Sequence, residues 1–173
     1  MDHRQGSTVF RPLLWRDTEG GEPPDISKIR GNISDEAKRY CLRIFDFHVS
    51  TPGNSYGADV GGCLRLVEIN VQPGRENTTF AETVFEVTIR KDMCNIFRIL
   101  HGACAAYIVD LCSVSALVAL GTALGFDATG VSQSMNLIWH HPIRLEENVK
   151  VISMSMSVKE KVRTMRCEVS IRS

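Results

Sequence analysis

The sequence predicts an α+β domain in which a curved antiparallel sheet wraps around one long buried helix. The first observation is the run from Leu100 to Phe126, which is apolar around most of a helix's circumference and carries one formal charge, Asp110. The second is a pair of strand patterns before this run, and the third is a set of three strand patterns after it. A single apolar helix framed by alternating strands is typical of an antiparallel sheet packed on that helix.

Length and composition fit one globular domain. The chain has 173 residues, of which 43% are hydrophobic and 23% charged, so extensive disorder is excluded. Lys plus Arg and Asp plus Glu number 20 each, and this balance argues against a nucleic-acid binder, which is usually basic. We expect residues 1–30 to form a flexible N-terminal arm, because glycines and prolines between residues 20 and 24 interrupt any period. Residues 31–173 form the single predicted domain.

An extra helix and two strands are predicted before the long helix. Ser34 can cap a helix, two acids follow in its first turn, and apolar residues recur at helical spacing up to Phe45. Glycines and a proline predict a loop over 50–62. Alternation then predicts strands over 64–71 and 81–90. In the first, Arg65, Val67, Ile69 and Val71 share one face, opposite Leu64, Leu66, Glu68 and Asn70; in the second, Ala81, Thr83, Phe85, Val87 and Ile89 share one face.

The run from Leu100 to Phe126 is either a core helix or a membrane span. It is long enough to cross a bilayer, but Asp110 at the centre of a span costs about 2.5–3.5 kcal/mol on insertion scales. The rest of the run is rich in Ala, Ser, Cys and Gly, and strands flank it on both sides. We therefore predict a core helix and no membrane span.

Three further strands are predicted after this helix. The alternating patterns cover 132–140, 152–158 and 164–171, with a polar turn at 159–161. Pro142 ends the first of them. Within it, Gln133, Met135, Leu137 and Trp139 share one face.

The six cysteines are predicted to be reduced and mostly buried. They stand at positions 41, 63, 94, 104, 112 and 167, without a C-x-x-C motif and without a histidine at metal-ligand spacing, so no metal site is expected. The first residues contain no apolar signal segment, which favours a cytoplasmic location. Arginines at positions 4, 11 and 16 leave a mitochondrial location open.

Several residues around the long helix could carry chemistry. Asp110 stands alone in an apolar helix, where lost hydration would make its carboxylate a stronger base; the alternative is a structural acid bonded to a nearby group. His101 and Gly102 begin the helix, where free N–H groups favour an anion and glycine permits close approach. His101 could equally be a cap or a packing residue. Asn95 is either a turn residue or a group that orients a carbonyl or a water.

The spacing of these residues matches a known family. The sequence NIFRILHGA begins at Asn95, Asp110 follows seven positions after Ala103, and GVSQSMN begins at Gly130. This resembles the hotdog-fold acyl-CoA thioesterases of the PaaI-like branch, whose pattern is N-x(5)-H-G-G-x(7)-D and then G-V-S-x-x-(M/L)-N. The resemblance covers about residues 60–172. It implies a hotdog fold and hydrolysis of an acyl-CoA thioester to free acid and CoA, as part of fatty acid metabolism.

The resemblance also implies roles for individual residues. Asp110 would be the nucleophile or the general base that activates water, and Ser132 would hydrogen-bond near the reacting group. The Gly102 N–H would polarise the thioester carbonyl, with His101 shaping that end of the helix. Asn95 would position the carbonyl or the attacking water. Apart from these implied roles, Ser134, Asn136 and Arg144 are substrate-binding candidates; Arg144 either meets the phosphates of CoA or is a solvated surface residue.

Two features depart from the family pattern. Ala103 replaces the second glycine, which narrows the approach to the helix end. The family usually continues through another strand beyond the position of Ser173, so we expect an open sheet edge there.

Spacing along the long helix also constrains the oligomeric state. Gly102 and Asp110 are eight residues apart, or ~12 Å along the axis at ~1.5 Å per residue. A nucleophile and an oxyanion donor must both lie about 3 Å from the reacting centre. One copy cannot supply both, so we expect a dimer, or a dimer of dimers, in which Asp110 of one subunit works with Asn95 and Gly102 of its partner.

The expected reaction needs no metal or redox cofactor, and CoA enters only as part of the substrate. Met135, Leu137 and Trp139 either line an apolar acyl channel or pack in the core. Two other functions stay open. One is a hotdog enoyl-CoA hydratase or dehydratase, for which His101 alone is placed as proton carrier; the other is a non-catalytic module that binds acyl-CoA.

Overall fold

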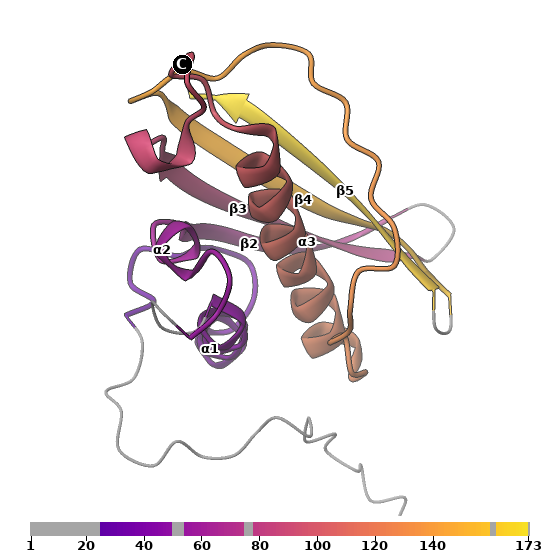
Figure 1. The fold of residues 1–173 in the computed structure, drawn as a ribbon. Coiled ribbons are helices and arrows are strands. Elements are labelled where there is room, and N and C mark those ends of the chain that lie inside the picture. Colours follow the sequence, from indigo (N-terminus) through magenta and orange to yellow (C-terminus); the bar gives the residue numbers. More distant parts are fainter. Residues whose placement is uncertain (1–24, 50–53, 75–77, 160–161, 173) are drawn as a thin grey trace, which may run out of the picture.

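In the computed structural model, a five-stranded sheet curves around the long helix α3 (Gly102–Leu124), as predicted (Figure 1). The structure describes residues 25–49, 54–74, 78–159 and 162–172. The elements before α3 are β1 (Arg30–Gly31), α1 (Asp35–Val49), α2 (Ala58–Gly61), β2 (Arg65–Pro73), β3 (Thr79–Thr88) and the 3-10 turn η2 (Lys91–Met93). After α3 come β4 (Asn148–Lys159) and β5 (Val162–Ile171). The sheet order is β1-β2-β3-β4-β5, with β1 parallel to β2 and the other neighbours antiparallel.

The N-terminal part of the described chain joins the core. Residues 1–24 of the predicted arm lie outside the described residues. Ile29 is buried, and Arg30 is aligned with Glu68 of β2, so packing begins slightly before the predicted boundary at residue 31. The apolar side chain of Ile29 accounts for this, because its burial against the core is favourable.

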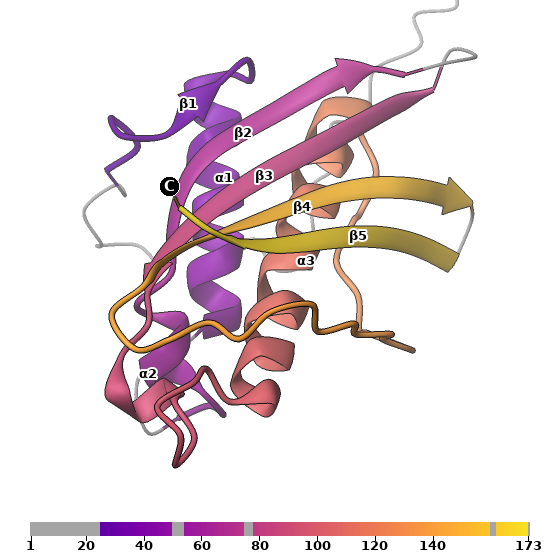
Figure 2. The same cartoon turned by 90° about the horizontal axis from the view of Figure 1, so that it is seen from above.

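The predicted N-terminal helix is confirmed as α1. The Ser34 hydroxyl accepts a hydrogen bond from the backbone N–H of Ala37 (3.2 Å), as an N-cap does. Figure 2 shows α1 and α3 beside each other on one face of the sheet. The Phe45 ring of α1 lies 4.7 Å from that of Phe85 in β3, centroid to centroid, and both are buried. The apolar stripe of α1 therefore covers the part of the core that α3 leaves open.

Strand β2 contains an irregularity that the alternation did not predict. The pairing register with β3 shifts between Leu66 and Glu68, which is the signature of a β-bulge. As a result Leu66 and Ile69 are both buried, although strict alternation places them on opposite faces. The predicted face of Ile69 relative to Leu66 is therefore wrong, whereas the alternation in β3 is confirmed, with Phe85 in its buried row.

Helix α3 begins at His101 and Gly102, as the sequence indicated, and ends at Gly125, which was not predicted as its end. The His101 ring nitrogen Nδ1 accepts from the N–H of Ala103 (3.1 Å), and Gly125 ends the helix with φ 76°. By length and composition α3 could cross a membrane, but more than half of its apolar window is buried against the sheet and α1, as in a core helix. Its burial varies along its length: residues 115–121 are all buried, whereas Gly102 and Asp110 are exposed. The prediction of a buried helix is therefore confirmed for residues 115–121 of α3 and wrong at Gly102 and Asp110.

Strand β4 turns its serines inward. Ser153 and Ser155 lie in the buried row, whereas Met156 on the opposite face is 57% exposed. The Ser155 hydroxyl accepts from the N–H of Ala81 in β3 (2.9 Å), so its burial leaves no unpaired oxygen. Small side chains in this row suit the close packing of α3 across β3 and β4.

The predicted strand over 132–140 is wrong for the single chain. Within the described residues this segment has no partner in the sheet, and it passes α3 on the side of β5 as an irregular stretch (Figures 1 and 2). Its apolar side chains are open to solvent, with Val131 90%, Ile138 69% and Trp139 57% exposed. Among the described strands β5 pairs with β4 alone, so its other edge is open.

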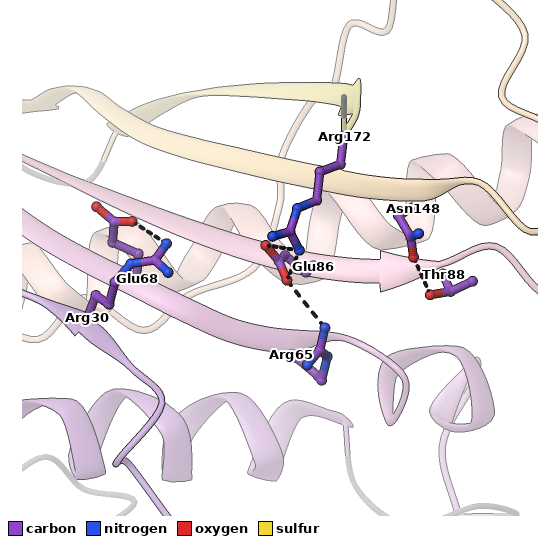
Figure 3. Close-up of polar contacts among 7 residues, drawn as sticks. All are labelled: Arg30, Arg65, Glu68, Glu86, Thr88, Asn148 and Arg172. Atoms are coloured by element: carbon purple, nitrogen blue, oxygen red, sulfur yellow. Dashed lines mark hydrogen bonds and ion pairs between the residues drawn. The ribbon is translucent and has the colours of Figure 1, made fainter.

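The outer face of the sheet is held by polar pairs between strands, which Figure 3 shows. The Glu86 carboxylate of β3 contacts the guanidinium groups of Arg65 (3.3 Å) and Arg172 (3.1 Å) on either side. The hydroxyl of Thr88 bonds to the side-chain oxygen of Asn148 (2.7 Å). These contacts tie the strands together on a face away from α3, so they position the sheet and take no part in the site described next.

Candidate active site

A closed loop before α3 brings Asn95 to the start of the helix. The N–H of His101 donates to the carbonyl of Met93 (2.9 Å), and the N–H of Asn95 donates to that of Ile99 (2.8 Å). The far side of the loop is fastened by the N–H of Leu100, which donates to Ile143 O (2.8 Å). The chain from Asn95 to His101 therefore forms one compact turn, which places Asn95 near the start of α3.

The amide oxygen and the amide nitrogen of the Asn95 side chain have different surroundings. Its oxygen Oδ1 accepts from the N–H groups of Phe97 (2.9 Å) and Ile99 (3.3 Å), which holds the turn. Within the described part of the chain the amide nitrogen Nδ2 has no partner, so it remains a donor. Both alternatives for Asn95 thus coexist: one end stabilises the turn and the other can bind a carbonyl or a water.

The start of α3 offers a second donor. The His101 side chain is exposed, and its Nδ1 accepts a hydrogen bond from the Ala103 N–H, which caps the helix. The N–H of Gly102 has no hydrogen-bond partner among the described residues, as expected for the first turn of a helix. Because Gly102 has no side chain and is exposed, an anionic or carbonyl oxygen can approach this N–H directly.

Asp110 and Ser132 form the second half of the candidate site. The Ser132 hydroxyl donates a hydrogen bond to a carboxylate oxygen of Asp110. Both residues are exposed, so the expectation that Asp110 loses its hydration is wrong for the single chain. Its carboxylate lies on the uncovered face of α3, beside the unpaired segment that carries Ser132. This acid is therefore held by one hydroxyl and open on its remaining side.

The two halves of the site do not meet within one chain. Helix α3 is unbroken from Gly102 to Leu124, so Gly102 and Asp110 remain about 12 Å apart along its axis. The single chain contains a pair of donors at one point and a carboxylate with its hydroxyl at another. Neither half alone therefore has both hydrogen-bond donors for a carbonyl oxygen and a carboxylate that can act as a base.

The remaining predicted residues lie around these two points. Ser134 and Asn136 are exposed on the unpaired segment between Ser132 and Trp139. Arg144 is exposed, and its backbone bridges to Ile99 of the Asn95 loop, so it stands near the start of α3. Trp139 lies at the start of α3 as well, and like Met135 (43% exposed) it is not buried in the core of the single chain.

The sequence did not indicate that α2 and the loop before it cover α3. Gly57 has φ 69°, and a Cβ on it would stand 2.7 Å from the ring of Tyr107 in α3. A Cβ on Gly61 would stand 3.0 Å from the hydroxyl of Tyr107, and the ring of Tyr56 packs edge-on against the ring of Tyr107. Burial raises the pKa of the Tyr107 phenol. The glycines at 57 and 61, four residues apart, were the available signal, but they suit any loop.

A cavity of about 560 Å³ lies at the other end of α3. Its lining includes Leu120 and Leu124 of α3 and Met156 of β4. Leu120 is 18 residues from Gly102, or about 27 Å along the helix axis. None of Met135, Leu137 and Trp139 lines this cavity, so it is separate from the acyl channel that these residues were expected to form.

The thiols and acids of the described residues do not form a metal centre. No group of three or more His, Cys, Asp or Glu side chains there is arranged to hold a metal ion. All six cysteines lie within the described residues as free thiols, and only Cys41 and Cys112 are buried, so the prediction that most of them are buried is wrong. Burial raises the pKa of the Cys41 thiol to about 12 and that of Cys104 to about 11, so these thiols remain protonated at neutral pH.

Comparison with known proteins identifies the fold. No protein-family model matches the sequence, and no curated protein matches it either. Among solved structures, thioesterase superfamily member 2 from mouse is similar with a TM-score of 0.60 at 18% identity, over 82% of this chain and 89% of that chain. The zebrafish member 2 gives 0.58 at 18% identity, over 75% and 83%. The E. coli PaaI protein from the phenylacetic acid degradation operon gives 0.50 at 12% identity, over 76% and 82%.

These similarities span most of each chain. They agree with the resemblance found in the sequence motifs. At 12–18% identity they establish architecture, whereas the chemistry has to be argued from the site. The described part of this chain is a hotdog-fold domain.

Proposed function

We propose that this protein hydrolyses acyl-CoA thioesters, with an active site formed by two copies of the chain. The observation that carries the proposal is the pair of incomplete half-sites on one helix. Free donors stand at Asn95 and Gly102, and a carboxylate with its hydroxyl partner stands at Asp110. Together they supply what thioester hydrolysis requires, namely donors for a developing oxyanion and a base or nucleophile. The fold, shared with proteins named as thioesterases, supports the same activity.

The reaction follows from these groups. The thioester carbonyl oxygen would accept hydrogen bonds from the Gly102 N–H and Asn95 Nδ2, which stabilise negative charge on that oxygen as the carbonyl carbon is attacked. Asp110 of the partner subunit would take a proton from water, whose oxygen then bonds to the carbonyl carbon. The carbon–sulfur bond breaks, and the CoA thiolate leaves and takes up the proton. Asp110 as a direct nucleophile is the alternative, with water then cleaving the acyl-aspartate.

Ser132 and His101 would position the groups that touch the substrate, namely the Asp110 carboxylate and the Gly102 N–H. The Ser132 hydroxyl holds one carboxylate oxygen of Asp110 and so leaves the other to face the water or the carbonyl. His101 caps α3 through Nδ1, which fixes the first turn that carries the Gly102 N–H. Proposed contacts with the CoA part of the substrate come from Ser134, Asn136 and Arg144.

The unpaired segment around 131–140 is the proposed contact between the two copies. It alternates like a strand, exposes several large apolar side chains and lacks a partner in the described sheet. Such a segment tends to pair with another chain, most simply with its own copy about a two-fold axis. In one chain Ser132 contacts Asp110 and Trp139 lies beside Gly102. Antiparallel pairing with Ser132 opposite the partner's Trp139 would bring the partner's Asp110 toward Gly102.

The direct test is release of free thiol from acyl-CoAs of short, medium and long chain. We expect turnover by the purified protein that is lost in Asp110→Asn. Gly125→Ala at the other end of α3 serves as the control for damage to the fold: its φ of 76° strains an alanine, but the residue lies far from Asp110, so thiol release should be retained. Saturable binding of the panel without any thiol release would instead identify an acyl-CoA-binding module. Hydration of an enoyl-CoA without thiol release would identify a hydratase.

A further inference from the structure

The ring of Trp139 stands beside Gly102, whose backbone N–H at the start of α3 is free among the described residues. A Cβ built on Gly102 would lie 3.9 Å from the indole atom Cζ2 of Trp139. Chain neighbours and the helix's own backbone aside, no other described residue comes within 4 Å of that position. The indole is 57% exposed, so it is not held in the core of the single chain. A large apolar ring thus borders the approach to the Gly102 N–H while remaining open to a ligand.

Resting on the proposed hydrolysis, we propose that Trp139 is a specificity-determining residue that selects acyl groups unbranched at the carbon next to the thioester carbonyl. The carbonyl oxygen bound by the Gly102 N–H places that carbon between the bare backbone of Gly102 and the indole edge. Carbon atoms pack best at about 3.5–4.0 Å, so a methylene fits against the ring, whereas a methyl branch has to displace it. Contact with the ring also removes water from the carbonyl, which strengthens its hydrogen bonds.

In the proposed pairing of the two copies, the ring of Trp139 would also contact the partner subunit. Ser132 and Trp139 are the two residues of the exposed segment that touch the two halves of the site. If the partner's Asp110 approaches Gly102, the partner's Ser132 comes with it and faces the indole. The ring would then be enclosed between Gly102 and the partner's Ser132. Its exposure in the single chain is what such an enclosure requires.

The neighbouring residue provides a matched control. Ile138 is also large, apolar and exposed (69%), but unlike Trp139 it does not come within 4 Å of a Cβ on Gly102. Ile138→Ala therefore removes a similar apolar surface from the same segment without touching the approach to Gly102. Trp139→Phe keeps an aromatic ring there, and Trp139→Ala removes the ring.

The first experiment compares hexanoyl-CoA with 2-methylhexanoyl-CoA in steady-state hydrolysis. We expect the wild type to prefer the linear substrate by about tenfold or more in kcat/KM, the usual worth of one methyl group in a shaped site. Trp139→Ala should lose most of this preference and at least about tenfold of kcat/KM on the linear substrate, while Trp139→Phe retains both within about threefold. Ile138→Ala removes apolar surface from the proposed contact between the copies, so it controls for any loss of rate from a weaker contact, and it should keep the wild-type preference for the linear substrate. An equal loss of this preference in Trp139→Ala and Ile138→Ala would overturn the assignment.

A binding measurement separates this inference from the proposed hydrolysis. The chain has two tryptophans, so Trp15→Phe leaves Trp139 as the sole indole fluorophore. Titration with S-hexyl-CoA, a thioether that cannot be hydrolysed, should change Trp139 emission saturably, with the same midpoint as in direct binding. If the protein binds the thioether with this change but cleaves no thioester, the position of Trp139 stands and the hydrolase proposal fails. If it cleaves thioesters and binds the thioether without a change in emission, the role of Trp139 is refuted and the hydrolase proposal stands.

Discussion

Replacing Gly102 with alanine separates the proposed role of this residue from its role in folding. A Cβ at this position meets the Trp139 ring edge at 3.9 Å, which is an ordinary van der Waals contact, and nothing closer. The residue is exposed in the first turn of α3, where alanine is the better helix former. The variant should therefore be more stable by about 0.4–1 kcal/mol, mainly because its unfolded chain has less conformational freedom.

The same methyl group should reduce activity. It stands beside the N–H that is proposed to bind the thioester carbonyl and narrows the space between that N–H and the indole. Loss of a whole oxyanion donor costs about 100- to 1,000-fold in kcat, so partial obstruction should cost about tenfold or more. Gain of stability with loss of activity is a combination that damage to the fold cannot produce.

The assay pairs thermal unfolding with thiol release from an acyl-CoA. Gly102→Ala should raise Tm by about 1–4 °C for a domain of this size and lower kcat. Gly125→Ala is the opposite control: its φ of 76° strains an alanine, so it should lower Tm and leave kcat unchanged. A Gly102→Ala protein that is stabilised and retains kcat within about twofold would refute the proposed carbonyl site.

Three further predictions concern the acid, its partner and a buried thiol. Asp110→Asn should lower kcat by at least about 100-fold and change the free energy of unfolding by less than about 0.5 kcal/mol, because this carboxylate is exposed; loss of Tm would instead reveal a structural acid. Ser132→Ala should lower kcat by less than Asp110→Asn does, whereas Ser132→Thr, which keeps the hydroxyl, should recover part of the rate; equal loss in both would argue against the hydrogen bond. Cys41 has a pKa raised by burial from 9.0 to about 12, so the stability it contributes is complete below pH 9 and is lost as the pH rises toward 12. Denaturant unfolding of wild type and Cys41→Val at pH 8.5 and 10.5 should show a loss in wild type that exceeds that of the variant by about 1–2 kcal/mol, and parallel losses would contradict the burial of this thiol.

Local sequence signals predicted the elements that depend on local interactions. Ser34 caps α1, as predicted, and His101 caps α3, which was one of the alternatives left open for it. Gly125 ends α3 in a left-handed conformation, although it was not predicted as the end of the helix. The alternation in β3 gave its buried row correctly because that strand is central and regular. These features need no knowledge of which distant segment packs against them.

The features that were missed or predicted wrongly depend on distant partners. No inward face was predicted for β4, because alternation alone does not say which row faces a helix. Its buried row contains Val149, Val151, Ser153 and Ser155. The bulge after Leu66 in β2 is a property of its pairing with β3. The segment over 132–140 has the alternation of a strand but no strand beside it in one chain, which is consistent with pairing to a second copy.

The candidate site shows the same division. The spacing of the motif predicted that Asn95, His101 and Gly102 lie together at the start of α3 and that Asp110 lies further along the same helix. The contact between Ser132 and Asp110 and the position of Trp139 beside Gly102 required coordinates, because both residues lie on a segment without regular structure. Helical geometry alone already indicated that the two halves of the site stand about 12 Å apart.

Complementation between two inactive variants tests the shared site most directly. Asn95→Ala and Asp110→Asn should each be nearly inactive alone, since each damages every composite site. If the two proteins are mixed in equal amounts and allowed to exchange subunits, half of the dimers are mixed, and each mixed dimer has one site without either lesion. Activity should then rise to about a quarter of the wild-type value, as expected for random pairing in a two-fold dimer. Mixed dimers, verified by differential tagging, that show no more activity than the separate variants would contradict a site formed by two subunits.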